Sequence, residues 1–287
     1  MTYLLLSILC STSIFLIFKI SEKFKTNLLK LIIINYLVAA SLGFYFNKYS
    51  ISVTTTITSN WFRYAVIIGI SYILMFFLIG YSTRKSGIVV TTIASKLSMV
   101  IPILYSILYF GEKNSFLKIT GLTMALVAVL LTCYRPIDKT KNVTLIILPI
   151  IIFIGSGVTD SLVKYTQNEH VSNNISLLFS AIVFSTALIA GLTISSINTK
   201  ASLKHTTISE FIGGITLGIV NFGSLYFFIL ALNTNIIDSS IIFGLNNLCI
   251  VLFSVFLGLI LFQEKFSRIN FAGIIIAFAA ILILMSF

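Results

Sequence analysis

Charged residues are scarce in this sequence. Only 9% of its 287 residues are Asp, Glu, Lys or Arg, whereas about 25% is usual in a soluble domain. Hydrophobic residues make up 58%, and the mean hydropathy is +1.08. A soluble protein of this length could not cover its surface with so few charges. The composition therefore excludes a soluble enzyme, a disordered chain and a fibrous protein, and it indicates a polytopic membrane protein.

Signatures of catalysis and metal binding are missing as well. The sequence has no Walker loop, no HExxH motif and no Ser/His/Asp set. Its three cysteines, Cys10, Cys133 and Cys249, lack metal or redox spacing, and both histidines, His170 and His205, fall in polar stretches. We therefore expect no catalytic centre, no metal site, no cofactor and no direct use of ATP.

Long apolar runs account for most of the chain. Because one helical crossing takes about 20 residues, a chain of this length allows about ten crossings with short loops. The runs are too long for barrel strands and lack their alternation, so we expect helices. The ten predicted spans are residues 4–18, 31–47, 64–83, 87–110, 119–134, 143–163, a stretch within 171–199, 211–237, 239–263 and 269–287.

Basic residues outnumber acidic ones, which gives a net charge of +11. They lie in short clusters between the apolar runs, so we interpret them as loop anchors and expect no nucleic-acid binding. The loops after the odd-numbered spans hold 13 Lys and Arg residues, and the loops after the even-numbered spans hold five. The positive-inside rule then predicts that both termini lie outside the cytoplasm.

An internal duplication divides the spans into two sets of five. The segment FGEK at residues 110–113 recurs as FQEK at residues 262–265. The predicted halves are 1–135 and 143–287, with a linker at 136–142. Because each half has an odd number of spans, the second half must insert upside down relative to the first. The predicted fold class is an all-α membrane protein of ten transmembrane helices in two inverted five-helix repeats, an architecture of secondary transporters.

This arrangement resembles the drug/metabolite transporter superfamily, and in particular its EamA/RhaT-like permeases. The similar features are the two five-helix repeats, the acidic residues Glu112 and Glu264 that close spans four and nine, and Pro102 inside span four. The resemblance covers nearly the whole chain and implies transport of a small solute such as an amino acid, a sugar or a drug. We expect Glu264 to be an interfacial anchor near the N-terminus of span ten.

Lys96 is the most unusual residue of the predicted spans. It lies inside span four, about 13–14 Å deep and therefore near the middle of a roughly 30 Å hydrocarbon core. A lysine at that depth costs about 2.5–3.5 kcal/mol on insertion scales. Thr92 and Ser95 share its helical face and are predicted to line the same site. We interpret Lys96 as a cavity-lining residue; the alternative is a structural lysine bonded to carbonyl groups or to a buried acid.

Span six contains the one clearly intramembrane acid, Asp160. We predict that it is a counter-ion for Lys96 or a proton-binding coupling group. The alternative is a local salt bridge with Lys164, four residues later on the same helical face.

Amides and a phenol in other spans are further predicted site residues. Asn246 and Asn247 fall in span nine at a depth equivalent to that of Lys96, and Asn221 and Tyr72 lie in spans eight and three. Adjacent asparagines among apolar residues need hydrogen-bond partners. We predict that they bind substrate, with structural interhelical bonding as the alternative.

The predicted function is secondary transport. We expect a permease that moves a small metabolite, such as an amino acid or another solute with an anionic group, across the bacterial inner membrane by alternating access. The expected partners are the small-molecule substrate and membrane lipid, and the chain is expected to be a monomer or a homodimer and not an enzyme. The alternatives are a membrane-embedded enzyme or lipid-handling protein without solute transport, and a scaffold without a solute path.

Overall fold

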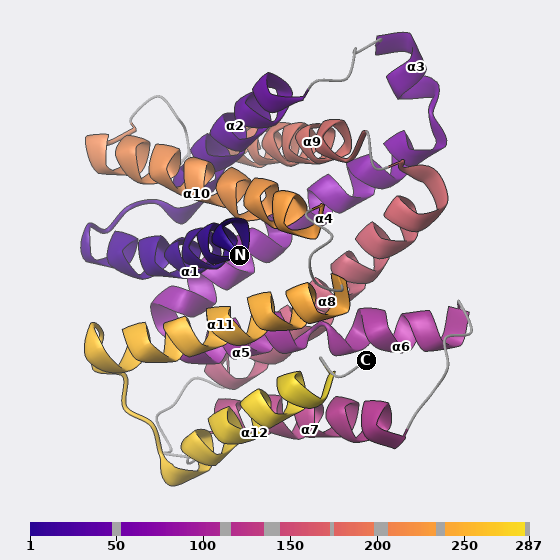
Figure 1. The fold of residues 1–287 in the computed structure, drawn as a ribbon. Coiled ribbons are helices and arrows are strands. Elements are labelled where there is room, and N and C mark those ends of the chain that lie inside the picture. Colours follow the sequence, from indigo (N-terminus) through magenta and orange to yellow (C-terminus); the bar gives the residue numbers. More distant parts are fainter. Residues whose placement is uncertain are drawn as a thin grey trace.

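The computed structural model describes residues 1–47, 53–109, 116–134, 144–172, 175–197, 206–233 and 239–284 (Figure 1). Within these ranges the chain is helical and forms no strand. The helices are α1 (Thr2–Lys23), α2 (Leu28–Phe46), α3 (Val53–Thr58), α4 (Asn60–Lys85), α5 (Ile88–Leu97), α6 (Val100–Tyr109), α7 (Phe116–Cys133), α8 (Thr144–His170), α9 (Ser176–Ile197), α10 (Ile208–Leu232), α11 (Ser239–Ile260) and α12 (Arg268–Leu284).

Seven helical segments of the described part are long and apolar enough to cross a membrane. They are α1, α2, α4, the α5–α6 segment, most of α8, α9 and α10. Shorter apolar helices lie within α7, α11 and α12. The protein is therefore an all-α membrane protein, as its composition predicts.

The long helices extend beyond the charge-free runs that predict them. α1 continues past residue 18 to Lys23, and α4 continues past residue 83 to Lys85. Basic residues in a last turn are stabilised by the helix dipole, and their long side chains reach past the apolar layer. Charge-free length therefore underestimates helix length. The short helix α3 has no counterpart among the predicted elements.

Helices from the two parts of the chain pack against each other. α2 packs against α9 at one edge of the bundle, and α7 packs against α12 at the opposite edge (Figure 1). Between these edges α1 packs against α10, and α8 packs against α4. α5 contacts both α8 and α11. The predicted linker 136–142 and the FGEK segment at 110–113 lie outside the described residues.

Glycines allow α10 to approach α2 closely. A Cβ atom at Gly214 would lie 2.5 Å from Cβ of Ile34, and one at Gly218 would lie 2.6 Å from Cβ of Val38. The four-residue spacing puts both glycines on one face, as in small-xxx-small packing between membrane helices. A side chain at either position would force the two helices apart.

The fourth predicted span is not one continuous helix. α5 ends at Leu97, and α6 begins at Val100. Pro102 has no amide hydrogen with which to bond the carbonyl of Ser98, four residues before it. That carbonyl instead accepts a hydrogen bond from the Ile101 amide at 2.9 Å. The proline inside the fourth predicted span explains the break.

Candidate functional site: a polar belt through the bundle

Polar side chains from seven helical segments are linked through the interior of the apolar bundle. Hydrogen bonds, the interaction of Lys96 with Asp160 and ring packing connect them in a circuit through α2, α10, α1, α11, the α5–α6 segment, α8 and α4. We name this set the polar belt; its residues are Asn35, Tyr36, Asn221, Ser224, Ser7, Asn246, Asn247, Lys96, Asp160 and Tyr72. Six of the eight predicted site residues belong to it, the exceptions being Thr92 and Ser95.

Lys96 lies in the last turn of α5 and is half-buried. α5 ends one residue later, so the negative end of its dipole lies beside this side chain. Among the described residues, no carboxylate lies within 4.0 Å of the ammonium group. The end of α5 therefore stabilises a positive charge that no ion-pair contact within the described ranges neutralises.

Asp160 lies on α8 and interacts electrostatically with Lys96. Protein surrounds this carboxylate, and yet the residue is exposed. Asp160 therefore borders space that the described residues leave accessible. In the described part of the chain it has no ion-pair contact within 4.0 Å, either with Lys96 or with Lys164. The counter-ion role of Asp160 stays a prediction, and no bridge within 4.0 Å between Asp160 and Lys164 is found among these residues.

Two glycines position α8 and with it Asp160. A Cβ atom at Gly155 would lie 2.5 Å from the sulfur of Met75 on α4. A Cβ atom at Gly157 would lie 2.7 Å from Cβ of Ile101 on α6. Because neither glycine has a side chain, α8 fits closely between these helices. The carboxylate one turn further along α8 is thereby held between α4 and the α5–α6 segment.

Tyr72 and Tyr36 continue the polar belt from Asp160 toward α2. Tyr72 on α4 lies near Asp160, and the rings of Tyr72 and Tyr36 both pack against the Phe184 ring, with centroids 6.5 Å and 6.0 Å from it. Tyr36 is only 1% exposed, and its ring centroid lies 5.6 Å from that of Phe76. Tyr72 is half-buried. Tyr36 is therefore fixed by packing, while Tyr72 is the phenol nearer to accessible space.

The two asparagines of α11 point to different neighbours. Nδ2 of Asn247 donates to the sulfur of Met99 at 3.3 Å, which places this amide beside the break that follows Lys96. Oδ1 of Asn246 accepts from the Ser7 hydroxyl of α1 at 3.3 Å. Asn246 is buried, and Asn247 is half-buried. Only Asn247 therefore faces the helix of the central lysine.

Asn221 uses its side chain to join two helices. Its side-chain amide on α10 is in hydrogen-bond contact with the side-chain amide of Asn35 on α2, at 3.1 Å. The Ser224 hydroxyl donates to the carbonyl of Asn221, and the Ser7 hydroxyl donates to the carbonyl of Ser224, both at 2.8 Å. This geometry matches structural interhelical bonding, the alternative interpretation of the amide residues.

Three buried hydroxyl groups have no hydrogen-bond partner within the described residues: those of Thr92, Ser156 and Ser254. α5 and α11 run antiparallel, because Val89 lies beside Gly258 while Met99 lies beside Asn247. Thr92 and Ser254 therefore fall at similar heights on this pair of helices. Thr92 is fully buried, so it does not line accessible space in this structure, in contrast to its predicted role.

Ser95 is half-buried on α5, next to Lys96. Its carbonyl accepts a hydrogen bond from the Ser98 hydroxyl at 2.6 Å, across the end of the helix. Its position beside Lys96 is therefore as predicted, but this hydrogen bond stabilises the end of α5.

Aromatic rings gather at the end of the bundle where α4 begins and α8 ends. The rings of Tyr64 and His170 stack with centroids 5.2 Å apart. Tyr165 meets Tyr64 edge-on at 5.5 Å and Tyr109 of α6 at 5.9 Å. His170, predicted in a polar loop, instead ends α8. Interfacial aromatic residues are typical of membrane proteins, and these rings connect three helices.

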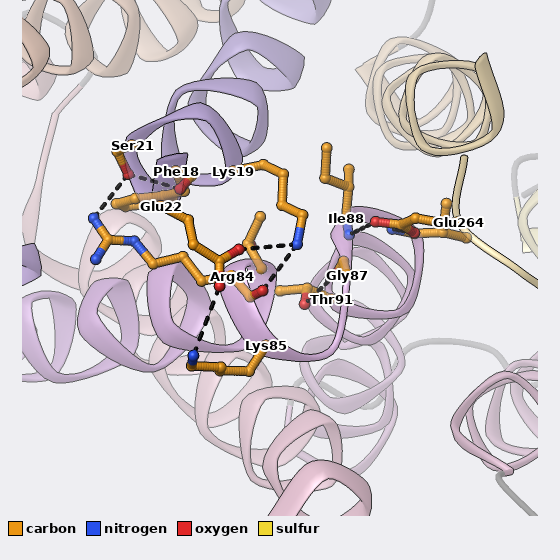
Figure 2. Close-up of polar contacts among 12 residues, drawn as sticks. Phe18, Lys19, Ser21, Glu22, Arg84, Lys85, Gly87, Ile88, Thr91 and Glu264 are labelled. Atoms are coloured by element: carbon orange, nitrogen blue, oxygen red, sulfur yellow. Dashed lines mark hydrogen bonds and ion pairs between the residues drawn. The ribbon is translucent and has the colours of Figure 1, made fainter. Parts of the chain in front are cut away.

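Charged side chains link α1 to α4 at the opposite end, which Figure 2 shows. Nζ of Lys19 contacts Oε2 of Glu22 at 3.1 Å and donates to the carbonyl of Arg84 at 2.8 Å. Nζ of Lys85 lies 3.7 Å from Oε1 of Glu22. The Arg84 guanidinium donates to both the carbonyl and the hydroxyl of Thr26. We name this end, where α1 and α4 finish, the basic end.

The basic end also holds contacts that the sequence does not predict. Glu210 caps α10 through a capping box with Thr207 and accepts from the Asn27 amide at 2.8 Å. Its Oε2 lies 3.6 Å from Nζ of Lys30. Lys30 is only 6% exposed and belongs to the first turn of α2. Its interpretation as a loop residue is therefore wrong, because its charge is paired against the start of α10.

Glu264 also differs from its predicted position. Its carboxylate accepts hydrogen bonds from the Ile88 and Val89 amides at the start of α5 (Figure 2). The N-cap of α12 is instead Ser267, whose hydroxyl accepts from the Asn270 amide at 3.2 Å. Glu264, which closes the ninth predicted span, thus caps the helix at the start of the fourth predicted span.

A groove of about 410 Å³ opens between α2, α4 and α9. Most of its lining is apolar, with Leu28, Phe77 and Ile194 among its residues. None of the polar belt residues line it. The groove and the belt are therefore separate features.

No protein-family model matches the sequence. The chain is 25% identical over 285 residues to an uncharacterized protein of Haemophilus influenzae, an alignment that covers 97% of this chain and 95% of that protein. Its fold is similar to that of a protein of known crystal structure, with a TM-score of 0.64, 13% sequence identity and coverage of 98% of this chain and 94% of the other. These likenesses extend over nearly the whole chain, and the second concerns the fold alone.

Proposed function

We propose that this protein is a secondary transporter of the bacterial inner membrane. It moves a small solute with an anionic group, such as an amino acid, by alternating access between two inverted halves. The observation behind this proposal is the pair Lys96 and Asp160, two opposite charges inside predicted spans that interact electrostatically without an ion-pair contact in the described structure. Intramembrane charges of this kind are costly and mark solute or ion pathways.

The packing of the helices supports ten spans in an inverted repeat. In the proposed repeat, each span of the first half is equivalent to one span of the second. The equivalent spans are α1 and α8, α2 and α9, α4 and α10, the α5–α6 segment and α11, and α7 and α12. The α1–α10 contact is then equivalent to the α8–α4 contact, and the α2–α10 contact is equivalent to the α9–α4 contact. All four contacts are present in the structure. The pairs α2–α9, α5–α11 and α7–α12 map onto themselves. Such an exchange is what a pseudo-two-fold axis produces, and five spans per half put that axis in the membrane plane.

Lys96 is suited to bind a carboxylate or another anionic group. Its ammonium group lies at the carboxyl end of a short helix, whose dipole keeps a positive charge favourable there and available to an anionic ligand. Asp160 lies close enough to interact with that charge and can receive an ammonium group of the same solute. Asn247 and Tyr72 supply neutral hydrogen-bonding groups on two further helices. An amino acid has both charges that this arrangement would bind.

The polar belt also supports alternating access. Lys96 and Tyr72 belong to the first proposed half, whereas Asp160 and Asn247 belong to the second. A rocking motion of one half against the other would therefore change the relative positions of the groups that bind the solute. The loops at the basic end hold more Lys and Arg residues than the loops at the opposite end, and this difference orients the basic end toward the cytoplasm. Substrate and membrane lipid are the proposed partners of a monomer or homodimer.

Transport can be tested before the solute is identified. Metabolite profiling of cells with and without the protein selects candidates, and exchange of each labelled candidate is then measured in proteoliposomes. We expect saturable exchange that is lost in Lys96→Met and kept in Lys265→Met, which removes an exposed charge outside the bundle. Exchange that is equal in protein-free liposomes and in both variants would contradict transport through this site.

A further inference from the structure

Glu264 holds the beginning of α5 through its carboxylate. After α11 ends, the chain turns through Gln263, whose φ is 49°, and the Glu264 amide donates to the carbonyl of Gly258 at 2.9 Å. Oε1 of Glu264 then accepts from the Ile88 amide at 2.6 Å, and Oε2 accepts from the Val89 amide at 3.3 Å (Figure 2). A carboxylate at this end satisfies free amide groups and complements the helix dipole.

Two glycines leave the space that this carboxylate occupies. Gly87 has a φ of 105°, a conformation that residues with a side chain rarely adopt. A Cβ atom there would lie 2.7 Å from Oε1 of Glu264. On the other side, a Cβ atom at Gly258 would lie 3.1 Å from Oε2. The fit therefore depends on missing side chains in both the α4–α5 turn and α11.

The helix that Glu264 caps is the one that presents Lys96. α5 has only ten residues, and its last turn contains Lys96. The break before α6 separates this short segment from the rest of the span. A contact at its first residues therefore fixes the position of the whole segment, and with it the ammonium group at the other end.

Other side chains at the basic end link neighbouring helices at the same level. Glu22 joins Lys19 of α1 to Lys85 of α4. Nζ of Lys23 lies 5.7 Å from the centre of the Phe262 ring, two residues before Glu264. The contact of Glu264 with α5 is thus one of several that hold the basic end together in this structure.

We propose that Glu264 is a positioning residue that keeps α5 against α11 while the basic end is closed. We name this contact the Glu264 latch; it comprises Glu264, Gly87, Ile88, Val89 and Gly258. Its release frees α5 when the basic end opens, and Lys96 then moves with α5 relative to Asp160. This inference rests on the proposed transport function, because it assigns the latch to one step of the transport cycle.

Cysteine labelling measures the opening of the basic end without a substrate. Val89 is only 1% exposed in this structure and packs beside Gly258. Val89→Cys, in a background with the three native cysteines changed to Ser, should react slowly with N-ethylmaleimide in membranes and completely after denaturation. We expect Glu264→Gln and Gly87→Ala each to raise this rate at least fivefold, because one removes the charge and the other fills its space.

Matched controls test whether the effect belongs to the latch. Lys265→Gln changes the adjacent exposed residue. Gly213→Ala changes a glycine of α10 whose added Cβ would meet Leu31 at 3.3 Å and no part of the latch. Both should leave the Val89→Cys labelling rate within twofold of the parent. All variants are also compared by thermal unfolding in detergent.

A second cysteine separates alternating access from general loosening. Ser161→Cys replaces a half-buried hydroxyl on α8, one residue beyond Asp160 toward the aromatic end. If the latch controls alternation, labelling at Ser161→Cys should fall at least threefold when labelling at Val89→Cys rises. Rates that rise at both positions, or rates within twofold of the parent in both latch variants, would overturn the proposal.

Failure of the latch and failure of transport give distinguishable results. Reciprocal labelling without exchange of any solute would retain the latch and refute transport. Exchange of a solute with unchanged labelling in Glu264→Gln would retain transport and refute the latch. Where a solute is known, Glu264→Gln should change the turnover rate more than the KM, because the groups that bind the solute remain in place.

Discussion

The ammonium group of Lys96 and the carboxylate of Asp160 interact electrostatically, yet no ion pair within 4.0 Å joins them in the described structure. A closely bonded pair would neutralise both charges and leave little charge for a ligand. Here the end of α5 supports the positive charge, and two glycines of α8 position the negative one. A solute with complementary charges can therefore bind both without first breaking a strong contact.

Removal of the lysine charge should abolish transport but preserve the fold. We expect Lys96→Met to lower proteoliposome exchange by about 10- to 100-fold, because a hydrogen bond to a charged group contributes about 1.5–3 kcal/mol. Its thermal stability in detergent should be unchanged or higher, since a charge leaves the bundle interior. Lys96→Arg should also impair exchange, because a planar guanidinium does not replace a compact ammonium. Wild-type exchange in Lys96→Met would make this lysine structural.

Asp160 should act together with Lys96 and not independently. We expect Asp160→Asn to reduce exchange at least tenfold. The double variant Lys96→Met/Asp160→Asn should lose little more than either single variant, because both remove parts of one binding arrangement. Exchange rates of the four proteins in a double-mutant cycle measure this coupling. If the fold losses in exchange of the two single variants multiply in the double variant, the two charges serve separate steps.

The Asn35–Asn221 contact should affect stability and leave selectivity unchanged. Asn221→Leu leaves the Asn35 amide without this partner inside the bundle and should cost about 1–3 kcal/mol. Asn35→Leu/Asn221→Leu should recover part of the loss, because both polar groups are then removed. Unfolding by sodium dodecyl sulfate, followed by circular dichroism, gives these differences. A changed solute preference with unchanged stability would instead assign Asn221 to the binding site.

The break between α5 and α6 should depend on Pro102. Pro102→Ala restores the amide that can bond the carbonyl of Ser98, so the two helices should become more continuous. We expect equal or higher thermal stability and slower exchange, because the dipole end beside Lys96 is lost. Pro149→Ala on α8 is the matched control, since it also removes a proline inside a helix. Equal effects of the two changes on exchange would argue against a specific role of the α5–α6 break.

Membrane orientation follows from the basic clusters. A reporter fused after Phe287 should be active on the periplasmic side, because 13 basic residues against five place the opposite loops in the cytoplasm. Paired fusions of alkaline phosphatase and green fluorescent protein measure this directly. A fluorescent, phosphatase-negative result would invert the orientation and leave the fold unchanged.

The central charges can be predicted from the sequence because a charge inside an apolar run stands out whatever its neighbours in space are. Lys96 and Asp160 are both of this kind, and the structure brings them into electrostatic contact. The depth of a residue in its run also indicates Asn247 and Tyr72. The position of a residue in its run does not show where its side chain points. Asn246 lies at a suitable depth but faces α1, and Thr92 lies at a suitable depth but is fully buried.

Partners at helix ends could not be predicted, since they come from distant parts of the chain. Glu210 pairs with Lys30, and Glu264 caps α5, 176 residues away from Ile88. A charged side chain at the end of an apolar run can face water, lipid headgroups or another helix. Its position in the sequence therefore does not indicate its partner. Helix packing alone decides among these.

The polar belt joins helices that are synthesised early to helices that are synthesised late, and this affects how the protein assembles in the membrane. Asn35 and Asn221 are 186 residues apart, so at about 5–20 residues per second the second amide is synthesised about 10–40 s after the first. During this interval α2 and α5 have entered the membrane without their partners from α10 and α11. The nascent first half therefore contains unpaired polar groups in lipid. We therefore expect the first half to gain its full stability only when α10 and α11 have been inserted.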